Sequence, residues 1–180
     1  MTGFWVCPRV RWRKVDQSGP VRRSSGSTFL KIELMFRGRY EHNVDPKGRL
    51  ALPSVWKKAL GDHGLVITTH VSEPCLVAYP EEEWAAFEER LAKLPQFDPS
   101  VMKLRRLYVG GAMDCGVDKQ GRVLVPPVLR EYASLERDVY WVGAIRTIEI
   151  WSKQKWVERV ESARQTVTAE DLAKLGELGI

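Results

Sequence analysis

The chain has 180 residues, 44% of them hydrophobic, which is enough for one domain or two small ones with a buried core. No apolar run approaches the roughly 18 residues that a membrane helix needs, and the N-terminal region lacks the apolar core of a signal peptide. The cysteines Cys7, Cys75 and Cys115 lie far apart and form no CxxC pair, which favours a reducing, cytoplasmic compartment.

The net charge of +5 resides in the first 34 residues. Residues 1–34 hold seven Lys or Arg and two acids, whereas residues 35–180 hold 21 of each sign. The high pI is therefore weak evidence for nucleic-acid binding, which must rest on local patches. Because residues 1–34 lack periodicity and contain Ser- and Gly-rich stretches, we expect a basic, disordered extension. One hypothesis is that translation in the cell begins at Met35.

The remaining chain is patterned as short strands and helices, which predicts an α+β fold. β-Branched runs between turn residues predict strands at 40–44, 49–52, 65–69, 75–79, 112–117, 122–125, 138–142 and 147–151. Prolines near helix starts, an Asp/Glu-rich first turn and a Ser N-cap at residue 152 predict helices at 54–60, 80–94, 101–109, 126–132 and 152–166. Residues 167–180 are expected to form a frayed tail with weak helical character.

The strongest pattern is a ten-residue segment that occurs twice. Residues 44–53 and 117–126 share Val, Asp, Gly, Arg and Pro at the same places, 73 positions apart. Two aromatic correspondences extend the match to the closing helix of each half: Tyr79 with Trp151, and Trp84 with Trp156. The chain therefore holds two copies of one supersecondary unit.

The Asp-x-x-Gly-Arg core of this repeat reads as a turn between two strands. The Asp can accept backbone N–H groups, the Gly supplies positive φ, and the Arg can pair with the Asp. A structural role is expected for Asp45, Gly48, Asp118, Gly121 and Arg122. The role of Arg49 stays open, because its guanidinium can pair with Asp45 or reach outward.

The first copy has the more basic surroundings. Residues 37–58 hold six basic side chains and two acids, a local net charge of +4, and the second copy has Gln120 in place of Lys47. Arg and Lys beside a turn and a strand can contact phosphates and guanine edges. If one copy contacts nucleic acid, we expect the first; a plain solvated charged face is the alternative.

No catalytic or metal-binding pattern stands out. The histidines His42, His63 and His70 lack HExxH or Cys-His spacing, and no Walker loop is present. The Glu run at residues 81–83 reads as the first turn of a helix. We therefore expect a protein that is not an enzyme and has no cofactor, metal or small-molecule substrate.

Further short motifs accompany the repeated turn in a fixed order. Together they are Met35-Phe-Arg-Gly38, Asp45-x-x-Gly-Arg-Leu50, Pro53, Tyr79-Pro-x-x-x-Trp84, Asp118-x-x-Gly-Arg-Val-Leu-Val-Pro126, Leu129-Arg130 and Glu149-Ile-Trp151. In this combination they resemble the MraZ family, bacterial transcriptional regulators associated with the division and cell-wall gene cluster. The resemblance covers roughly residues 35–160, and family proteins begin at the Met-Phe-Arg-Gly segment, in line with the Met35 hypothesis.

The resemblance implies a tandem pair of SpoVT/AbrB-like units whose β-hairpins interleave in the swapped-hairpin manner. They would form one pseudo-symmetric, β-barrel-like domain with flanking helices. The implied units are residues 39–81 and 110–153, joined by connecting helices at 82–109. The extension at 1–34 precedes them, and a C-terminal helix and tail at 154–180 follow.

The resemblance also implies function and partners. Family proteins form ring-shaped homo-oligomers, bind direct repeats in double-stranded DNA upstream of their own operon and act mainly as repressors. This implies a cytoplasmic, nucleoid-associated protein that gains affinity through multivalency. The expected DNA contacts are Arg37, Lys47 and Arg49, whereas Arg39 is not carried over from the family. Two alternatives stay open: an AbrB-like antitoxin, and a ring or scaffold protein that does not bind DNA.

Overall fold

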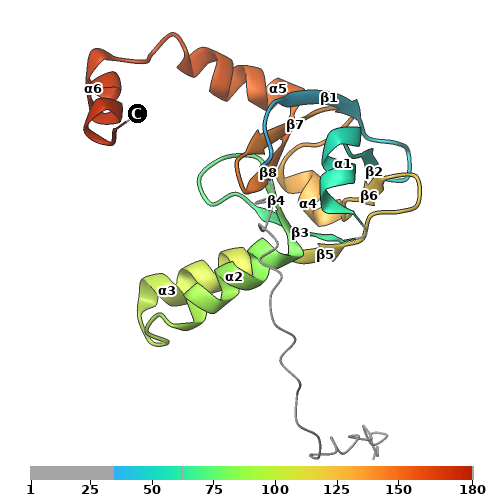
Figure 1. Cartoon of the computed structure of the whole chain (residues 1–180), viewed down its shortest axis with the longest axis horizontal. Helices are drawn as coiled ribbons and strands as arrows, with labels where there is room; N and C mark the ends of the chain where they lie inside the picture. The colour runs from blue at the N-terminus through green and yellow to red at the C-terminus, as the bar shows by residue number, and fades with distance from the viewer. Residues whose placement is uncertain (1–34, 62, 180) are drawn as a thin grey trace, which may run out of the picture. The chain divides into compact units, whose positions relative to one another are not determined.

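The computed structural model describes residues 35–61 and 63–179, so the expectations for residues 1–34 lie outside the described residues. The strands are β1 (Arg39–Asn43), β2 (Arg49–Ala51), β3 (Leu65–Thr69), β4 (Leu76–Pro80), β5 (Met113–Cys115), β6 (Arg122–Leu124), β7 (Asp138–Ala144) and β8 (Thr147–Ser152). The helices are α1 (Ser54–Leu60), α2 (Glu81–Ala92), α3 (Pro99–Leu104), α4 (Pro127–Tyr132), α5 (Lys153–Trp156) and α6 (Ala169–Glu177). Two π-helical segments, η1 (Arg105–Val109) and η2 (Val157–Glu161), continue α3 and α5. The mixture of helices and antiparallel strands confirms the α+β class (Figure 1).

The strands form two antiparallel sheets, and the strand order of both is consistent with the internal repeat. The larger sheet has the order β1-β7-β8-β4-β3-β5, and the smaller pairs β2 with β6. If each strand is replaced by its counterpart in the other copy, the strand order of the larger sheet is reversed and otherwise unchanged. The first strand of each copy pairs with the other copy, β1 with β7 and β5 with β3. In the smaller sheet Leu50 faces Val123, its own counterpart 73 positions on, so an approximate two-fold axis passes between them.

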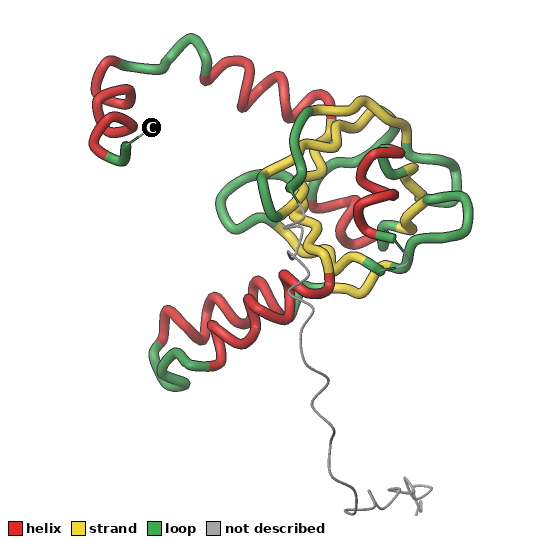
Figure 2. The backbone as a smooth tube through the Cα atoms, viewed as in Figure 1, coloured by secondary structure: helices red, strands yellow, loops and turns green. Residues whose placement is uncertain are grey.

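The main core lies beneath the β2–β6 ribbon and joins both copies. Leu50 and Val123 are fully buried and point into it from the ribbon. Trp141 of β7 is also fully buried, and its Nε1 donates a hydrogen bond to the carbonyl of Ala51 at 3.0 Å. The core also includes Phe36, Trp56, Leu60, Leu65, Ile67, Leu76, Leu129, Ile148 and Ile150. Because α1 and α4 both pack on this core, they lie next to the ribbon, as Figures 1 and 2 show.

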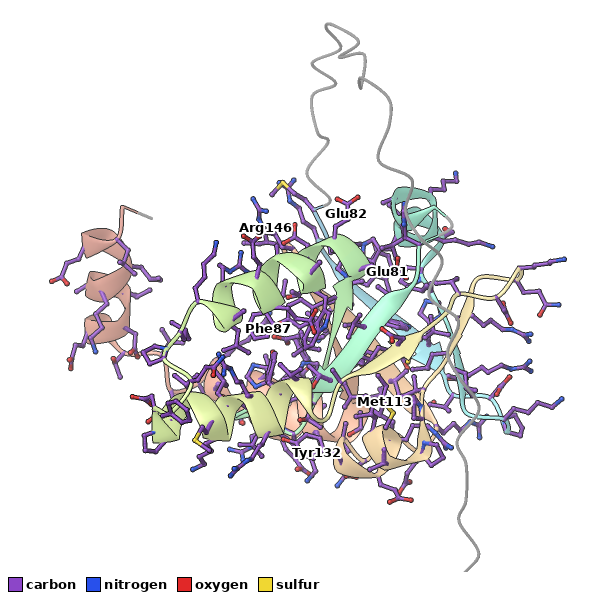
Figure 3. All side chains as sticks on the ribbon, turned by 90° about the horizontal axis from the view of Figure 1, so that it is seen from below. Glu81, Glu82, Phe87, Met113, Tyr132 and Arg146 are labelled. Carbon is purple, nitrogen blue, oxygen red and sulfur yellow. The ribbon has the colours of Figure 1, made fainter. Side chains whose placement is uncertain are left out.

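The predicted aromatic correspondence is seen as the same edge-to-face contact in both copies. Tyr79 and Trp84 have ring centroids 5.3 Å apart, and Trp151 and Trp156 have theirs 5.7 Å apart. In the first copy α3 and η1 fold back beside α2, and Phe87 points toward them in Figure 3. Phe87 meets Tyr108 of η1 at a centroid distance of 5.4 Å. The first copy thus has an aromatic cluster that ties the helix pair to the sheet.

One detail of the sequence prediction is wrong. The helix predicted over 80–94 ends at Ala92, so Leu94 lies beyond the helix and is 43% exposed. The helical character predicted for the tail is present as α6, because Thr168 and Asp171 form a capping box that satisfies its first backbone N–H groups. The Ser152 cap is confirmed, since its side chain accepts from the N–H of Lys155 at 3.1 Å.

Candidate nucleic-acid interface

The first Asp-x-x-Gly-Arg turn is held by one carboxylate. Asp45 Oδ1 accepts the backbone N–H groups of Lys47 and Arg49 at 2.8 and 2.9 Å. Its Oδ2 accepts Arg49 Nε at 2.7 Å. These bonds, led by the one from the Arg49 backbone, hold the pKa of Asp45 below its usual value. Gly48 has φ +79°, a left-handed conformation that favours glycine.

The second turn repeats this geometry. Asp118 Oδ1 accepts the N–H groups of Gln120 and Arg122, both at 2.9 Å. Its Oδ2 accepts Arg122 Nε at 2.9 Å and lies 2.8 Å from Nη2. The Arg122 backbone bond is the largest cause of a lowered pKa of Asp118, and Gly121 has φ +77°. Arg49 and Arg122 therefore behave alike: each arginine pairs with the aspartate of its own turn.

The β2–β6 ribbon places both turns on one surface. Leu50 and Val123 point inward, so the alternate residues point outward, including Arg49 and Arg122. Each turn is also anchored to the other copy, since Leu52 N–H donates to the Gly121 carbonyl and Val125 N–H to the Gly48 carbonyl. We call the surface formed by 45–49, 118–122 and the outer side of β2 and β6 the ribbon face. It belongs to both copies, although the sequence favoured the first alone.

A basic side chain from each helix crosses to the turn of the other copy. Lys57 of α1 donates from Nζ to the Lys119 carbonyl at 3.2 Å, and Gly121 lies directly beneath it. Arg130 of α4 donates from Nε to the Val125 carbonyl at 3.0 Å and covers Gly48. Lys57 and Arg130 are 73 positions apart, so the spacing of the repeat identifies them as counterparts in the two copies. Neither was among the predicted contacts, and Lys119, exposed on the second turn, was not either.

Two of the three predicted DNA contacts come together. Lys47 is exposed at the tip of the first turn, beside the half-buried Arg49. Arg37 lies elsewhere, because it follows Phe36, which pairs with Ile145 at the far end of β1. The five residues of β1 span roughly 17 Å and separate Arg37 from the turn. Arg37 and Lys47 are close in the sequence, but they therefore do not lie together on the ribbon face.

Arg39 has a different role in the structure. Its guanidinium lies 4.7 Å from the ring centroid of Tyr140 and 5.2 Å from that of Trp156. Its Nη1 forms an ion pair with Glu161 at 3.2 Å. Arg39 therefore holds the C-terminal helix against β1 and β7, in agreement with leaving it out of the predicted contacts.

Among the described residues no group of three or more His, Cys, Asp or Glu is placed to hold a metal ion. Cys75 and Cys115 are buried free thiols, and burial raises the pKa of Cys115 to about 11. No helix in the described ranges is long and apolar enough to cross a membrane.

The duplicated fold defines a two-repeat α+β protein, and comparison with known proteins identifies its family. A family model described as MraZ protein, antitoxin-like, matches residues 35–107 and 108–175. The transcriptional regulator MraZ of Acetivibrio thermocellus is 44% identical over 147 residues, 81% of this chain and 100% of the relative. That of Lachnoclostridium phytofermentans is 46% identical over 122 residues, 68% of this chain and 84% of the relative. The chain belongs to the MraZ family, as its motifs predicted.

Proposed function

We propose that this protein is a sequence-specific, DNA-binding transcriptional regulator that acts mainly as a repressor. The observation that carries the proposal is the ribbon face, where two turns of the same geometry place arginines beside exposed lysines. The relatives' shared name, transcriptional regulator, supports the same function. Lys47 and Arg49 are the proposed contacts in the first turn. Arg37 would contact the same DNA only beyond the ribbon face, from the far end of β1.

The two turns of the ribbon face are alike in shape and in net charge, since each holds one Asp, one Lys and one Arg, but their charges are placed differently. Lys47 of the first turn corresponds to Gln120 of the second, and Pro46 corresponds to Lys119; beside the face, Lys58 of α1 corresponds to Glu131 of α4. A symmetric surface would fit a palindrome equally well in both orientations. An unequal one favours a single orientation, which supports direct repeats as the target.

The proposed target is a set of direct repeats upstream of the division and cell-wall gene cluster, including the protein's own gene. A ring-shaped homo-oligomer would present one ribbon face to each repeat, so affinity would rise through multivalency. Within each chain, the exchange of β1 and β5 between copies supports a swapped-hairpin, barrel-like pair of units at 39–81 and 110–153. Residues 82–109 would connect them and 154–180 would follow. This function places the protein in the cytoplasm, on the nucleoid.

Footprinting on the DNA upstream of the protein's own gene tests the proposal. Evenly spaced, protected repeats are the expected result, with protection lost in Arg49→Ala while cooperative thermal unfolding is retained. Retained protection in Arg49→Ala would remove that residue from the contacts. A complete absence of protected repeats with wild-type protein would favour the alternative, a ring or scaffold that does not bind DNA.

A further inference from the structure

We infer that Lys57 and Arg130, the side chains that cross between copies, bind the DNA phosphates that flank the ribbon face. This inference rests on the proposed DNA-binding function and assigns a chemical task to residues outside the two repeated turns. In this arrangement the turn arginines would lie where base edges are read. Lys57 and Arg130 would add positive charge at the margins of the ribbon face.

Lys57 and Arg130 differ from the turn arginines in their electrostatic surroundings. Arg49 and Arg122 each form an ion pair with an aspartate of their own turn, so each pair contributes no net charge. Lys57 and Arg130 have no ion-pair partner among the described residues, and both bind only a backbone carbonyl. The exposed Lys47 and Lys119 on the ribbon face, and Lys57 and Arg130 beside it, are therefore cations whose charge no ion pair neutralises among the described residues.

Lys57 and Arg130 each have more N–H donors than their one hydrogen bond to the protein uses. A lysine ammonium has three N–H donors, and Lys57 uses one of them on the Lys119 carbonyl. An arginine has five, and Arg130 uses its Nε–H on the Val125 carbonyl, which leaves both terminal nitrogens for a ligand. Glu136 lines the same groove as Arg130 but lies outside ion-pair distance. The remaining donors match the needs of phosphate oxygens.

Both crossing side chains are already held in place in the free protein. A Cβ added to Gly48 would lie 2.9 Å from the Arg130 guanidinium carbon, and one added to Gly121 would lie 2.6 Å from Lys57 Cδ. Each long side chain is thus laid across a glycine of the other copy. Lys57 Nζ is held by the Lys119 carbonyl of the other copy, and Arg130 Nε by the Val125 carbonyl of its own copy. Holding these side chains in the free protein lowers the conformational entropy lost when DNA binds.

Salt titration of DNA binding tests this inference with the full chain. We would measure affinity of wild type, Lys57→Gln and Arg130→Gln for a duplex carrying the protected repeats and for a mixed-sequence duplex. Each substitution should weaken binding to both duplexes roughly tenfold near 0.1 M salt. Each should also reduce the slope of log K against log salt by about 0.9, the value for one lost phosphate contact.

Matched variants separate phosphate binding from support of the turn. Lys103→Gln removes an equal charge from an exposed position on α3 and should keep the wild-type slope. Lys57→Arg and Arg130→Lys keep the cation and should also retain it. An unchanged slope in Lys57→Gln and Arg130→Gln, with weaker affinity and a lower Tm, would overturn the inference and make both residues turn supports. If wild type binds both duplexes equally, the operator proposal fails, while the slope change still decides the phosphate contacts.

Discussion

At the scale of single residues, the carboxylates of Asp45 and Asp118 decide the geometry of the ribbon face. Each accepts two backbone N–H groups and one arginine, so the carboxylate fixes both the turn and the direction of the guanidinium. Replacing either acid would release an arginine with full charge but without a defined position. The higher net charge would strengthen DNA binding, whereas the undefined position of the arginine would weaken it.

The lowered pKa values of Asp45 and Asp118 predict an acid-sensitive fold. A carboxyl whose folded-state pKa is depressed contributes stability above its unfolded pKa, near 3.9, and loses it as pH falls through the folded value. Unfolding free energy should therefore decline below about pH 4, and Asp45→Asn with Asp118→Asn should flatten that decline while lowering stability at pH 7. Urea unfolding from pH 7 to pH 2.5 measures this. Parallel pH profiles for wild type and the double variant would contradict it.

At the scale of elements, the aromatic cluster around Tyr108 joins the α3–η1 helix to α2. Tyr108 is 8% exposed, and its hydroxyl lies 2.8 Å from that of Tyr79. Tyr108→Ala should destabilise the protein by about 3–5 kcal/mol through cavity formation. Tyr108→Phe keeps the ring and should cost about 0.5–1.5 kcal/mol, the net value of one hydrogen bond. Urea unfolding with equal m-values for both variants checks this, and equal costs would show that ring packing contributes little.

The sequence predicted most elements, because turn residues and β-branched runs act locally. It predicted the turn formed by Asp-x-x-Gly-Arg for the same reason, since every hydrogen-bond partner of the Asp45 and Asp118 side chains lies within four residues. The crossing of Lys57 and Arg130 was missed because it depends on how α1 and α4 pack against the opposite copy. Arg37 was grouped with Lys47 by sequence proximity, but the strand between them holds them apart. The pairing of β1 with β7 could not be predicted, because the residue pattern of a strand does not indicate which other strand it pairs with.

At the scale of the whole molecule, each copy depends on the other for a strand, a core and a turn. β1 pairs with β7 and β5 with β3, and β2 and β6 pair with each other. Buried residues of both copies share one core beneath the ribbon. The ribbon face, including both crossing side chains, therefore exists only when the two copies are combined.

This dependence predicts the behaviour of the separated copies. Residues 35–107 or 108–180 alone would lack the partner strands and leave half of the shared core open to water, so neither should be a folded monomer. Mixed or co-expressed, the fragments should form a 1:1 complex that unfolds in one transition. Light scattering with chromatography and circular dichroism would measure both. Because the copies are related by a pseudo-two-fold axis, a fragment that folds alone should do so as a homodimer in which β1 or β5 exchanges between chains. A cooperatively folded monomer of either fragment would contradict the shared core.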